Sequence, residues 1–165
     1  MAKIAIRDVL SSDAGLIVDI YNHYIEHTII TFEEAVISAA EMASRISETW
    51  SNGLPFLVAE YGDQVVGYAY ASAWKGRCAY RYSVETTVYL APDMTGKGVG
   101  YPLYQALFSK LREGSIHVAI AGIALPNEAS VALHEKCGMY KVGQFVEVGF
   151  KFDRYIDVGY WQLSL

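Results

Sequence analysis

The strongest constraint on this chain is a segment in which an apolar strand runs into a glycine-rich loop and then into a helix. β-Branched and aromatic residues dominate Ser83–Leu90, which is typical of a strand. Ala91-Pro92-Asp93 ends the strand, and Thr95–Gly100 then contains three glycines. Apolar residues follow at helical spacing at positions 103, 104, 107, 108 and 111. Glycine-rich backbone at the N-terminus of a helix predicts a site for phosphate groups.

Two familiar phosphate motifs do not fit this loop. A P-loop requires Ser or Thr directly after its Gly-Lys pair, whereas Gly98 follows Lys97 here. A dinucleotide fingerprint requires a small residue where Tyr101 stands, and an acid about 20 residues further on. That second region reads Ile116–Ala121 and contains no acid. A flexible turn that binds nothing stays open as the alternative at this point.

Length and composition restrict the class of protein. The 165 residues fit one domain, residues 1–165, and 53% of them are hydrophobic. The sequence shows no run long and apolar enough for a membrane span and no signal peptide at its start, so we expect a cytoplasmic protein without a membrane partner. A net charge of −5 argues against a nucleic-acid partner. Two cysteines, Cys78 and Cys137, do not form a disulfide framework.

Periodicity and turn signals predict a mixed sheet flanked by helices. Ser38 with Glu41 is a capping box for the second helix, which Asn52-Gly53 ends. Asn127 is a candidate cap for a short helix that ends at Gly138. The expected elements are strand Ile4–Arg7, helix Asp13–His27, extended Thr28–Phe32, helix Ser38 to about Trp50, hairpin Phe56–Glu60 and Val65–Trp74, strand Tyr80–Leu90, the helix after the loop, strand Ile116–Ala124, the short helix, and hairpin Val142–Phe152 and Asp157–Leu163.

One carboxylate stands in the middle of the central strand. Strand alternation places Glu85 on one face with Thr87 and Tyr89. A carboxylate in a core strand costs free energy unless it has a partner or a purpose. It is therefore either a general base with a raised pKa or the partner of a structural arginine such as Arg81, and the sequence favours neither.

A cluster of cations precedes that strand. Between Trp74 and Val84 the chain carries Lys75, Arg77 and Arg81 among tyrosines and no acid. Because guanidinium groups bind oxyanions with paired hydrogen bonds, the cluster predicts an anion clamp, and its alternative is an ordinary solvated loop.

Three further residues have weaker signals. His23 and His27 in His-Tyr-Ile-Glu-His match one zinc-peptidase pattern, but no second helix offers a third ligand, so we expect no metal. Cys78 has no neighbouring histidine in the sequence and is interpreted as incidental. His134 on the short helix is compatible with a core or a surface imidazole.

Together these segments resemble the GNAT superfamily of N-acetyltransferases. The superfamily match rests on strand Val84–Leu90, the loop ending Gly98-Val99-Gly100, and Asn127–Gly138. Within the superfamily the chain is most similar to the phosphinothricin N-acetyltransferases, which also act on methionine sulfoximine and sulfone. That similarity covers nearly the whole chain, through Tyr21–Glu26, Trp74–Arg77, Ala79-Tyr80, Val84–Tyr89, Leu125–Asn127 and Asp157–Gln162.

The resemblance implies a splayed pair of parallel strands with acetyl-CoA between them, no metal, and a homodimer. It implies Glu85 as the general base. His134 replaces the superfamily's tyrosine acid and is a candidate to protonate or hydrogen-bond the leaving thiolate, while the identity of the acid stays open. Thr95 stands where the superfamily loop usually opens with Arg or Gln. The implied acceptor residues are Phe32, Lys75, Arg77, Tyr80 and Glu85. The implied acetyl-CoA residues are Val88, Tyr89, Leu90, Gly96, Lys97, Gly98, Val99, Gly100, Tyr101, Asn127 and Ser130.

The resulting hypothesis is direct transfer of an acetyl group from acetyl-CoA to the amine of a small, anionic or polar amino acid. One alternative keeps the enzyme class but changes the acceptor to a polyamine, an aminoglycoside or a protein N-terminus. The acid-free loop between Trp74 and Val84 disfavours the polycationic acceptors, which need acidic pockets. The other alternative is a non-catalytic CoA-binding module, which the presence of Glu85 disfavours.

Overall fold

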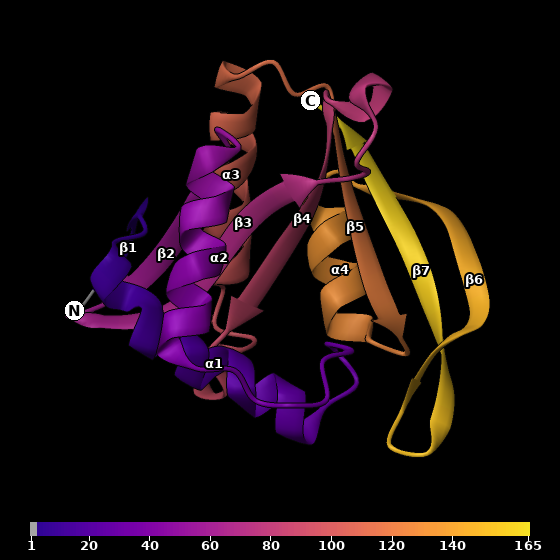
Figure 1. Cartoon of the computed structure of the whole chain (residues 1–165), viewed down its shortest axis with the longest axis horizontal. Coiled ribbons are helices and arrows are strands. Elements are labelled where there is room, and N and C mark those ends of the chain that lie inside the picture. Colours follow the sequence, from indigo (N-terminus) through magenta and orange to yellow (C-terminus); the bar gives the residue numbers. More distant parts are fainter. Residues whose placement is uncertain (1–2) are drawn as a thin grey trace.

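The computed structural model describes residues 3–165 as a seven-stranded sheet with helices on both faces (Figure 1). The strand order is β1-β2-β3-β4-β5-β7-β6, and each neighbouring pair is antiparallel except β4 with β5. The bounds are β1 Ile4–Asp8, α1 Ala14–His27, α2 Ala39–Ser51, β2 Phe56–Tyr61, β3 Gln64–Ala73, β4 Ser83–Leu90, α3 Gly100–Glu113, β5 Val118–Leu125, α4 Glu128–Lys136, β6 Tyr140–Lys151 and β7 Arg154–Ser164. The predicted order of elements and the mixed, mostly antiparallel sheet are confirmed.

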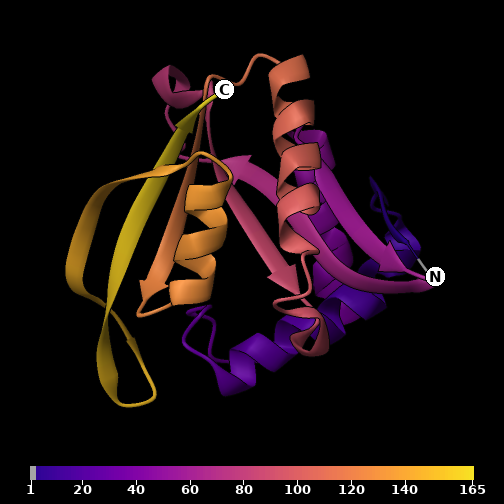
Figure 2. The same ribbon diagram turned by 180° about the vertical axis from the view of Figure 1, so that it is seen from behind.

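Two apolar cores attach the helices to the sheet. On one face, Ile17 of α1 and Ile46 of α2 belong to a buried cluster with Phe56 and Tyr68 of the sheet. Helices α3 and α4 cover the other face, which Figure 2 shows from behind. There the helical stripe predicted over residues 103–111 is buried, as expected for the apolar side of an amphipathic helix.

Strands β4 and β5 separate after three paired positions. Their register joins Ser83 to Val118 and ends where Glu85 meets Ile120. Beyond that point β4 is paired with β3, and β5 is paired with β7. The two ribbons diverge in Figure 1, which confirms the predicted splayed parallel pair. A sheet that opens in this way leaves backbone hydrogen-bonding groups free at its centre.

The predicted N-caps are confirmed, but the reciprocal bond of the Ser38–Glu41 capping box is not formed, because the Glu41 carboxylate accepts from Arg45 instead. The Ser38 hydroxyl accepts a hydrogen bond from the Glu41 amide at 3.1 Å, and the Asn127 side chain caps α4 in the same way. Gly53 and Gly138 follow the ends of α2 and α4 with φ of +68° and +92°, a backbone region that glycine occupies without steric cost.

Two predicted segments begin or continue differently. The strand predicted over Tyr80–Leu90 begins at Ser83, because Cys78–Tyr80 form a 3-10 turn whose amides bond back to preceding carbonyls. Only the start of the segment predicted as extended, Thr28–Phe32, is extended, and the following residues form bends. Local hydrogen bonds within these short segments override the β-propensity of their side chains.

The second hairpin has a tighter turn than predicted. Its strands run to Lys151 and start again at Arg154, so that the turn consists of Phe152 and Asp153 alone. Both turn residues have positive φ, 52° and 56°, as in a type I′ turn. Such turns usually carry Asn-Gly, so the Phe-Asp sequence gave no signal for one here.

Candidate active site

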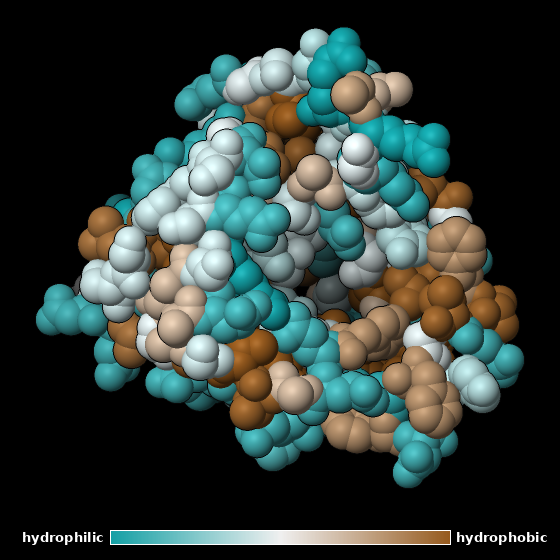
Figure 3. Space-filling view, viewed as in Figure 1, coloured by the Kyte–Doolittle hydropathy of each residue, from teal (hydrophilic) through white to brown (hydrophobic). Residues whose placement is uncertain are grey.

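The gap between β4 and β5 contains two adjoining cavities of about 410 Å³ each. One lies at Glu85 and the other lies along the glycine loop. Ile30, Val88, Tyr89, Asn127 and Ser130 border both cavities, which therefore form one groove. Figure 3 shows the surface hollowed near the centre of this face.

Strand β4 turns alternate peptide groups toward the groove. The Ser83 carbonyl accepts from the amide of Trp74, the residue that follows β3, and the Ala91 amide donates to the Val66 carbonyl of β3. Because peptide groups alternate between the two edges of a strand, those of Val88 and Leu90 point to the edge that β5 leaves open. The Leu90 carbonyl accepts a hydrogen bond from the Tyr24 hydroxyl at 2.6 Å. The Val88 peptide and the Leu90 amide are thus directed into the groove.

The glycine loop forms the wall at the other end. Gly96 and Gly98 have φ of +72° and +80°, a backbone region that glycine occupies without steric cost. The Lys97 amide between them donates to the Met94 carbonyl at 3.4 Å. Gly100 begins α3, and a Cβ there would lie 2.9 Å from Leu133 Cδ2 of α4. This glycine lets α3 and α4 approach closely, so that both helices border the groove.

Some of the charged and hydroxyl side chains around the loop line the groove, and others do not. Lys136 of α4 borders the groove and places its ammonium 5.0 Å from the ring centre of Tyr101, which also lines it. Val99 and Thr95 line the same wall, and the Thr95 hydroxyl donates to the Pro92 carbonyl at 2.8 Å. Lys97 is exposed on the loop and lies outside the described groove wall. Lys136 is therefore the charged side chain that lines this end of the groove.

Glu85 stands at the point where the strands separate and lines the groove. Burial raises the pKa of its carboxyl above the usual value, and the charge of Lys75 acts in the opposite direction. Pairing with Arg81 is wrong, because that guanidinium donates to the Cys78 carbonyl at 3.0 Å and lies 4.6 Å from the Tyr82 ring centre. A half-buried carboxyl of this kind is suited to accept a proton near neutral pH.

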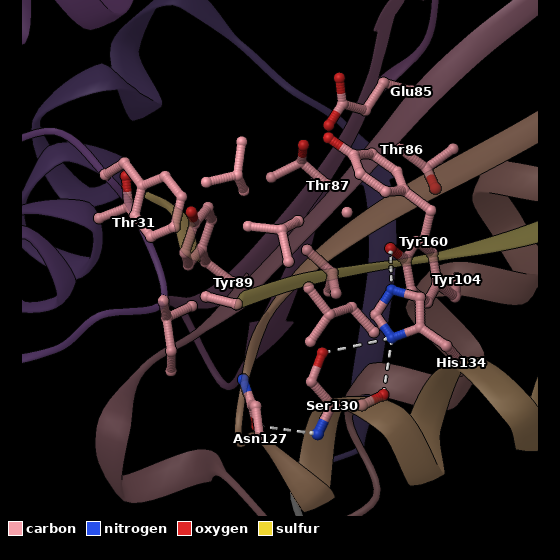
Figure 4. Close-up of a pocket in the computed structure, with 18 residues that line it drawn as sticks. Thr31, Glu85, Thr86, Thr87, Tyr89, Tyr104, Asn127, Ser130, His134 and Tyr160 are labelled. Atoms are coloured by element: carbon pink, nitrogen blue, oxygen red, sulfur yellow. Dashed lines mark hydrogen bonds between the residues drawn. The ribbon is translucent and has the colours of Figure 1, made fainter. Parts of the chain in front are cut away.

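Tyr160 of β7 faces Glu85 across the groove, and Figure 4 shows its hydroxyl turned toward the carboxyl group. Burial raises the pKa of Tyr160, and the nearby charge of Glu85 adds to that shift. Gly122 of β5 makes room for the pair, since a Cβ there would lie 3.2 Å from the Tyr160 ring and 3.5 Å from Glu85 Oε1.

His134 is a buried, neutral imidazole with a defined tautomer. Its Nδ1 lies 2.6 Å from the Ser130 carbonyl, which can only accept, so Nδ1 carries the proton. Its Nε2 lies 2.9 Å from the Tyr104 hydroxyl and accepts from it (Figure 4). Burial lowers the pKa of His134, against the smaller effect of the Ser130 carbonyl, which keeps the ring uncharged at neutral pH.

The predicted acceptor residues are not all brought together in this chain. Phe32 and Glu85 line the groove. Lys75 and Tyr80 border a different cavity of about 390 Å³, although Lys75 is near enough for its charge to affect Glu85. Arg77 is exposed and borders neither cavity in the described structure.

The remaining candidates of the sequence do not assemble a second site. The His23 and His27 rings lie 5.0 Å apart, and residues 3–165 contain no group of three His, Cys, Asp or Glu side chains that could hold a metal. Cys78 is exposed and Cys137 is buried, and both are free thiols. Within the same residues, no helix is both long and apolar enough to cross a membrane.

Several residues of the groove wall were not predicted from the sequence, among them Tyr24, Thr31, Tyr104, Lys136 and Tyr160. Each lies on an element whose local pattern indicates core or surface. Tyr104, for example, belongs to the apolar stripe of α3, and its hydroxyl acquires a role only because α4 brings His134 against it. The signal is a tertiary contact, which local periodicity does not contain.

Comparisons with known proteins agree with this geometry. Residues 6–159 match the family model described as an acetyltransferase (GNAT) domain. The chain is 39% identical to a phosphinothricin N-acetyltransferase of Streptomyces coelicolor, over 99% of this chain and 98% of that protein. It is 34% identical to an L-methionine sulfoximine/L-methionine sulfone acetyltransferase of Salmonella typhimurium, over 97% and 94%. A phosphinothricin acetyltransferase of Sinorhizobium meliloti, solved in complex with acetyl-CoA, superposes with a TM-score of 0.95 at 37% identity, over 98% and 88%.

Proposed function

Because the chain belongs to the GNAT family of acetyltransferases, we propose that it moves an acetyl group from acetyl-CoA to the amine of a small amino acid with a second anionic or strongly polar group. Phosphinothricin, methionine sulfoximine and methionine sulfone are the proposed acceptors, by similarity to the relatives above. The observation that carries the proposal is the groove with a half-buried Glu85 at one end and the glycine loop at the other. Residues 1–165 then serve as one catalytic domain in the cytoplasm.

The groove fits acetyl-CoA by its own chemistry. The free Val88 peptide and Leu90 amide offer hydrogen bonds to an extended amide-containing arm. The backbone amides at the start of α3, with the Lys136 ammonium, fit a pyrophosphate. Bound acetyl-CoA supplies an acetyl group activated as a thioester. Asn127 and Ser130 border the passage between the two halves of the groove.

Glu85 is the proposed general base. An amino group is mostly protonated at neutral pH and must lose a proton before it attacks a carbonyl carbon. The raised pKa of Glu85 keeps its carboxylate basic enough to accept that proton, directly or through a water molecule. The Val88 amide, directed into the groove, is the proposed hydrogen-bond donor to the carbonyl oxygen as charge develops on it.

We assign Tyr104 and His134 together to the stabilisation of the leaving thiolate sulfur. In the tautomer fixed by Ser130, His134 has no N–H of its own to spare, because Nδ1–H is bonded and Nε2 holds the Tyr104 hydroxyl hydrogen. The pair therefore shares one hydrogen, that of the Tyr104 hydroxyl, and Tyr104 lines the groove. Burial raises the pKa of Tyr104, so in the proposed step the hydroxyl keeps its proton, turns from His134 Nε2 and donates a hydrogen bond to the leaving thiolate. His134, which stands in place of the superfamily's tyrosine, acts through Tyr104.

A homodimer is the proposed assembly. Strand β6 lies at the edge of the sheet, and apolar side chains gather on that hairpin at the right of Figure 3. They include Phe145, Val146, Val148 and Tyr155, which are 60%, 72%, 59% and 67% exposed. A contiguous apolar surface of this kind is typical of a protein interface. Sedimentation at several protein concentrations would show a dimer, and a purely monomeric protein would contradict this part of the proposal.

The test of function is an amine panel with acetyl-CoA, followed by release of free thiol. Phosphinothricin, methionine sulfoximine and methionine sulfone are expected to react far faster than spermidine or an aminoglycoside. EDTA is expected to leave the rate unchanged. Turnover of polyamines with none of the three amino acids would refute the acceptor, and zinc-dependent activity would restore the histidine pair as a site.

A further inference from the structure

Lys151 is a buried ammonium that the proposed mechanism does not use. It lies near the end of β6 with 2% of its surface exposed. Its Nζ donates to the carbonyls of Ile25 and Thr31, each at 2.8 Å. Ile25 belongs to the last turn of α1, where unpaired carbonyls and the helix dipole favour a cation. One side chain therefore joins the C-terminal hairpin to α1 and to the loop that follows α1.

Gly149 lies two residues before Lys151 on the same buried side of β6. A Cβ at this glycine would overlap the ring of Phe32. Because glycine has no Cβ, the Phe32 ring can pack directly against the backbone at Gly149. Lys151 is hydrogen-bonded to Thr31, and Gly149 packs against Phe32. Two residues on the same face of β6 therefore fix two consecutive residues of the loop.

The loop held in this way is a wall of the site. Ile30, Thr31 and Phe32 all border the cavity that contains Glu85. The Thr31 hydroxyl is also hydrogen-bonded to Tyr21 of α1 at 2.8 Å, which ties the loop to the helix from its other side. The width of the cavity opposite Glu85 therefore depends on where β6 holds this loop.

We propose that Lys151 and Gly149 are positioning residues that set the affinity and size selectivity for the acceptor amino acid by fixing Thr31 and Phe32. The inference rests on the proposed function, because it takes the cavity at Glu85 as the acceptor's place. Neither residue touches the reacting atoms, and both act through the loop.

The first test is Lys151→Met, which keeps an unbranched side chain of similar length and removes the two hydrogen bonds. The KM for phosphinothricin or methionine sulfoximine is expected to rise about tenfold or more, as for lost bonds to a charged group. The KM for acetyl-CoA should stay within about twofold and kcat should change less than the acceptor KM. Lys141→Met on the same strand is the control, because its ammonium is exposed and bonds to Gln144.

The second test is a cycle of Gly149→Ala and Phe32→Leu. Alone, Gly149→Ala is expected to displace the ring and raise the acceptor KM several-fold. In the Phe32→Leu background it should add nothing, since leucine lacks the ring atoms that the new methyl group would meet. Gly143→Ala is the matched control, because its Cβ would meet nothing within 4 Å. An equal effect of Gly149→Ala in both backgrounds would show that Gly149 does not act through the Phe32 ring. If Lys151→Met does not fold, this cycle decides the proposal.

Hydrogen exchange separates this proposal from the function it rests on. Amides of residues 28–34 are expected to exchange faster in Lys151→Met than in the wild type, whichever amine the enzyme accepts. If no amino acid is acetylated but exchange still rises, the acceptor assignment fails and the positioning role stands. Unchanged exchange and unchanged acceptor KM in Lys151→Met would overturn the positioning role.

Discussion

The two ends of the groove are built in different ways. Most of the end along the glycine loop comes from one continuous stretch of chain, from β4 through residues 95–100 into α3, with α4 packed beside it and Tyr24 and Ile30 as its contacts with α1 and the loop after α1. The end at Glu85 is assembled from the loop after α1, from β4, β5, β6 and β7, and from α3 and α4. An end built mostly from one stretch of chain (the contiguous end) should tolerate substitutions elsewhere in the fold. An end built from several separate elements (the assembled end) depends on the contacts between those elements.

This difference is consistent with the division of labour proposed for the enzyme. The contiguous end would bind the part of acetyl-CoA that every reaction shares, and backbone amides suffice for that. The assembled end would select the acceptor and carry the proton transfers. Variants at one end should therefore leave the kinetic and binding constants of the other end nearly unchanged.

Glu85→Gln should have the largest effect. It preserves shape but removes the base, so kcat is expected to fall by roughly 10²–10⁴-fold. The acetyl-CoA affinity, measured by calorimetry, should be unchanged because Glu85 lies at the other end. Glu48→Gln on exposed α2 is the control. Near-normal turnover of Glu85→Gln at neutral pH would make Glu85 a structural residue.

Tyr104→Phe should have the next largest effect, a fall in kcat of about tenfold or more. His134→Leu should give a similar loss, because leucine has no acceptor for the Tyr104 hydroxyl. If the two residues act as one pair, the double variant should be little worse than either single variant. Additive losses measured in single-turnover experiments would separate their roles.

Gly98→Ala should weaken acetyl-CoA alone. The residue has φ of +80°, where a Cβ costs on the order of 1–3 kcal/mol, so the dissociation constant is expected to rise about tenfold. The acceptor KM should not change. Gly76→Ala is the control, since its Cβ would meet open space and its φ is ordinary. Equal changes in both constants would show that the ends are coupled.

Lys75→Gln should produce the smallest effect, visible in the pH profile. The base acts when deprotonated, and burial already raises the pKa of Glu85, so kcat/KM should fall on acidification at a higher pH than an ordinary glutamate would give. Lys75 lowers that pKa, so its removal should move the acidic limb further toward higher pH. A limb that moves the other way, or not at all, would show that Lys75 does not act on Glu85.

Local sequence patterns are enough to predict the order of elements, the glycine loop and the position of Glu85 on its strand. These follow from local rules, since the apolar period, the caps at Ser38 and Asn127 and the glycines at Gly53 and Gly138 act within a few residues. The wrong predictions of element bounds also concern short segments. The start of β4 and the Phe152-Asp153 turn lack the residue types that such structures usually carry.

The tertiary structure alone decided what surrounds Glu85. The splay of β4 from β5, the contact of Tyr104 with His134 and the approach of Tyr160 join residues far apart in the chain. The same holds for Lys151, which reaches carbonyls more than a hundred residues earlier. A sequence pattern records which face of an element is apolar, but packing determines which polar groups on different elements meet, and the chemistry of this site depends on those meetings.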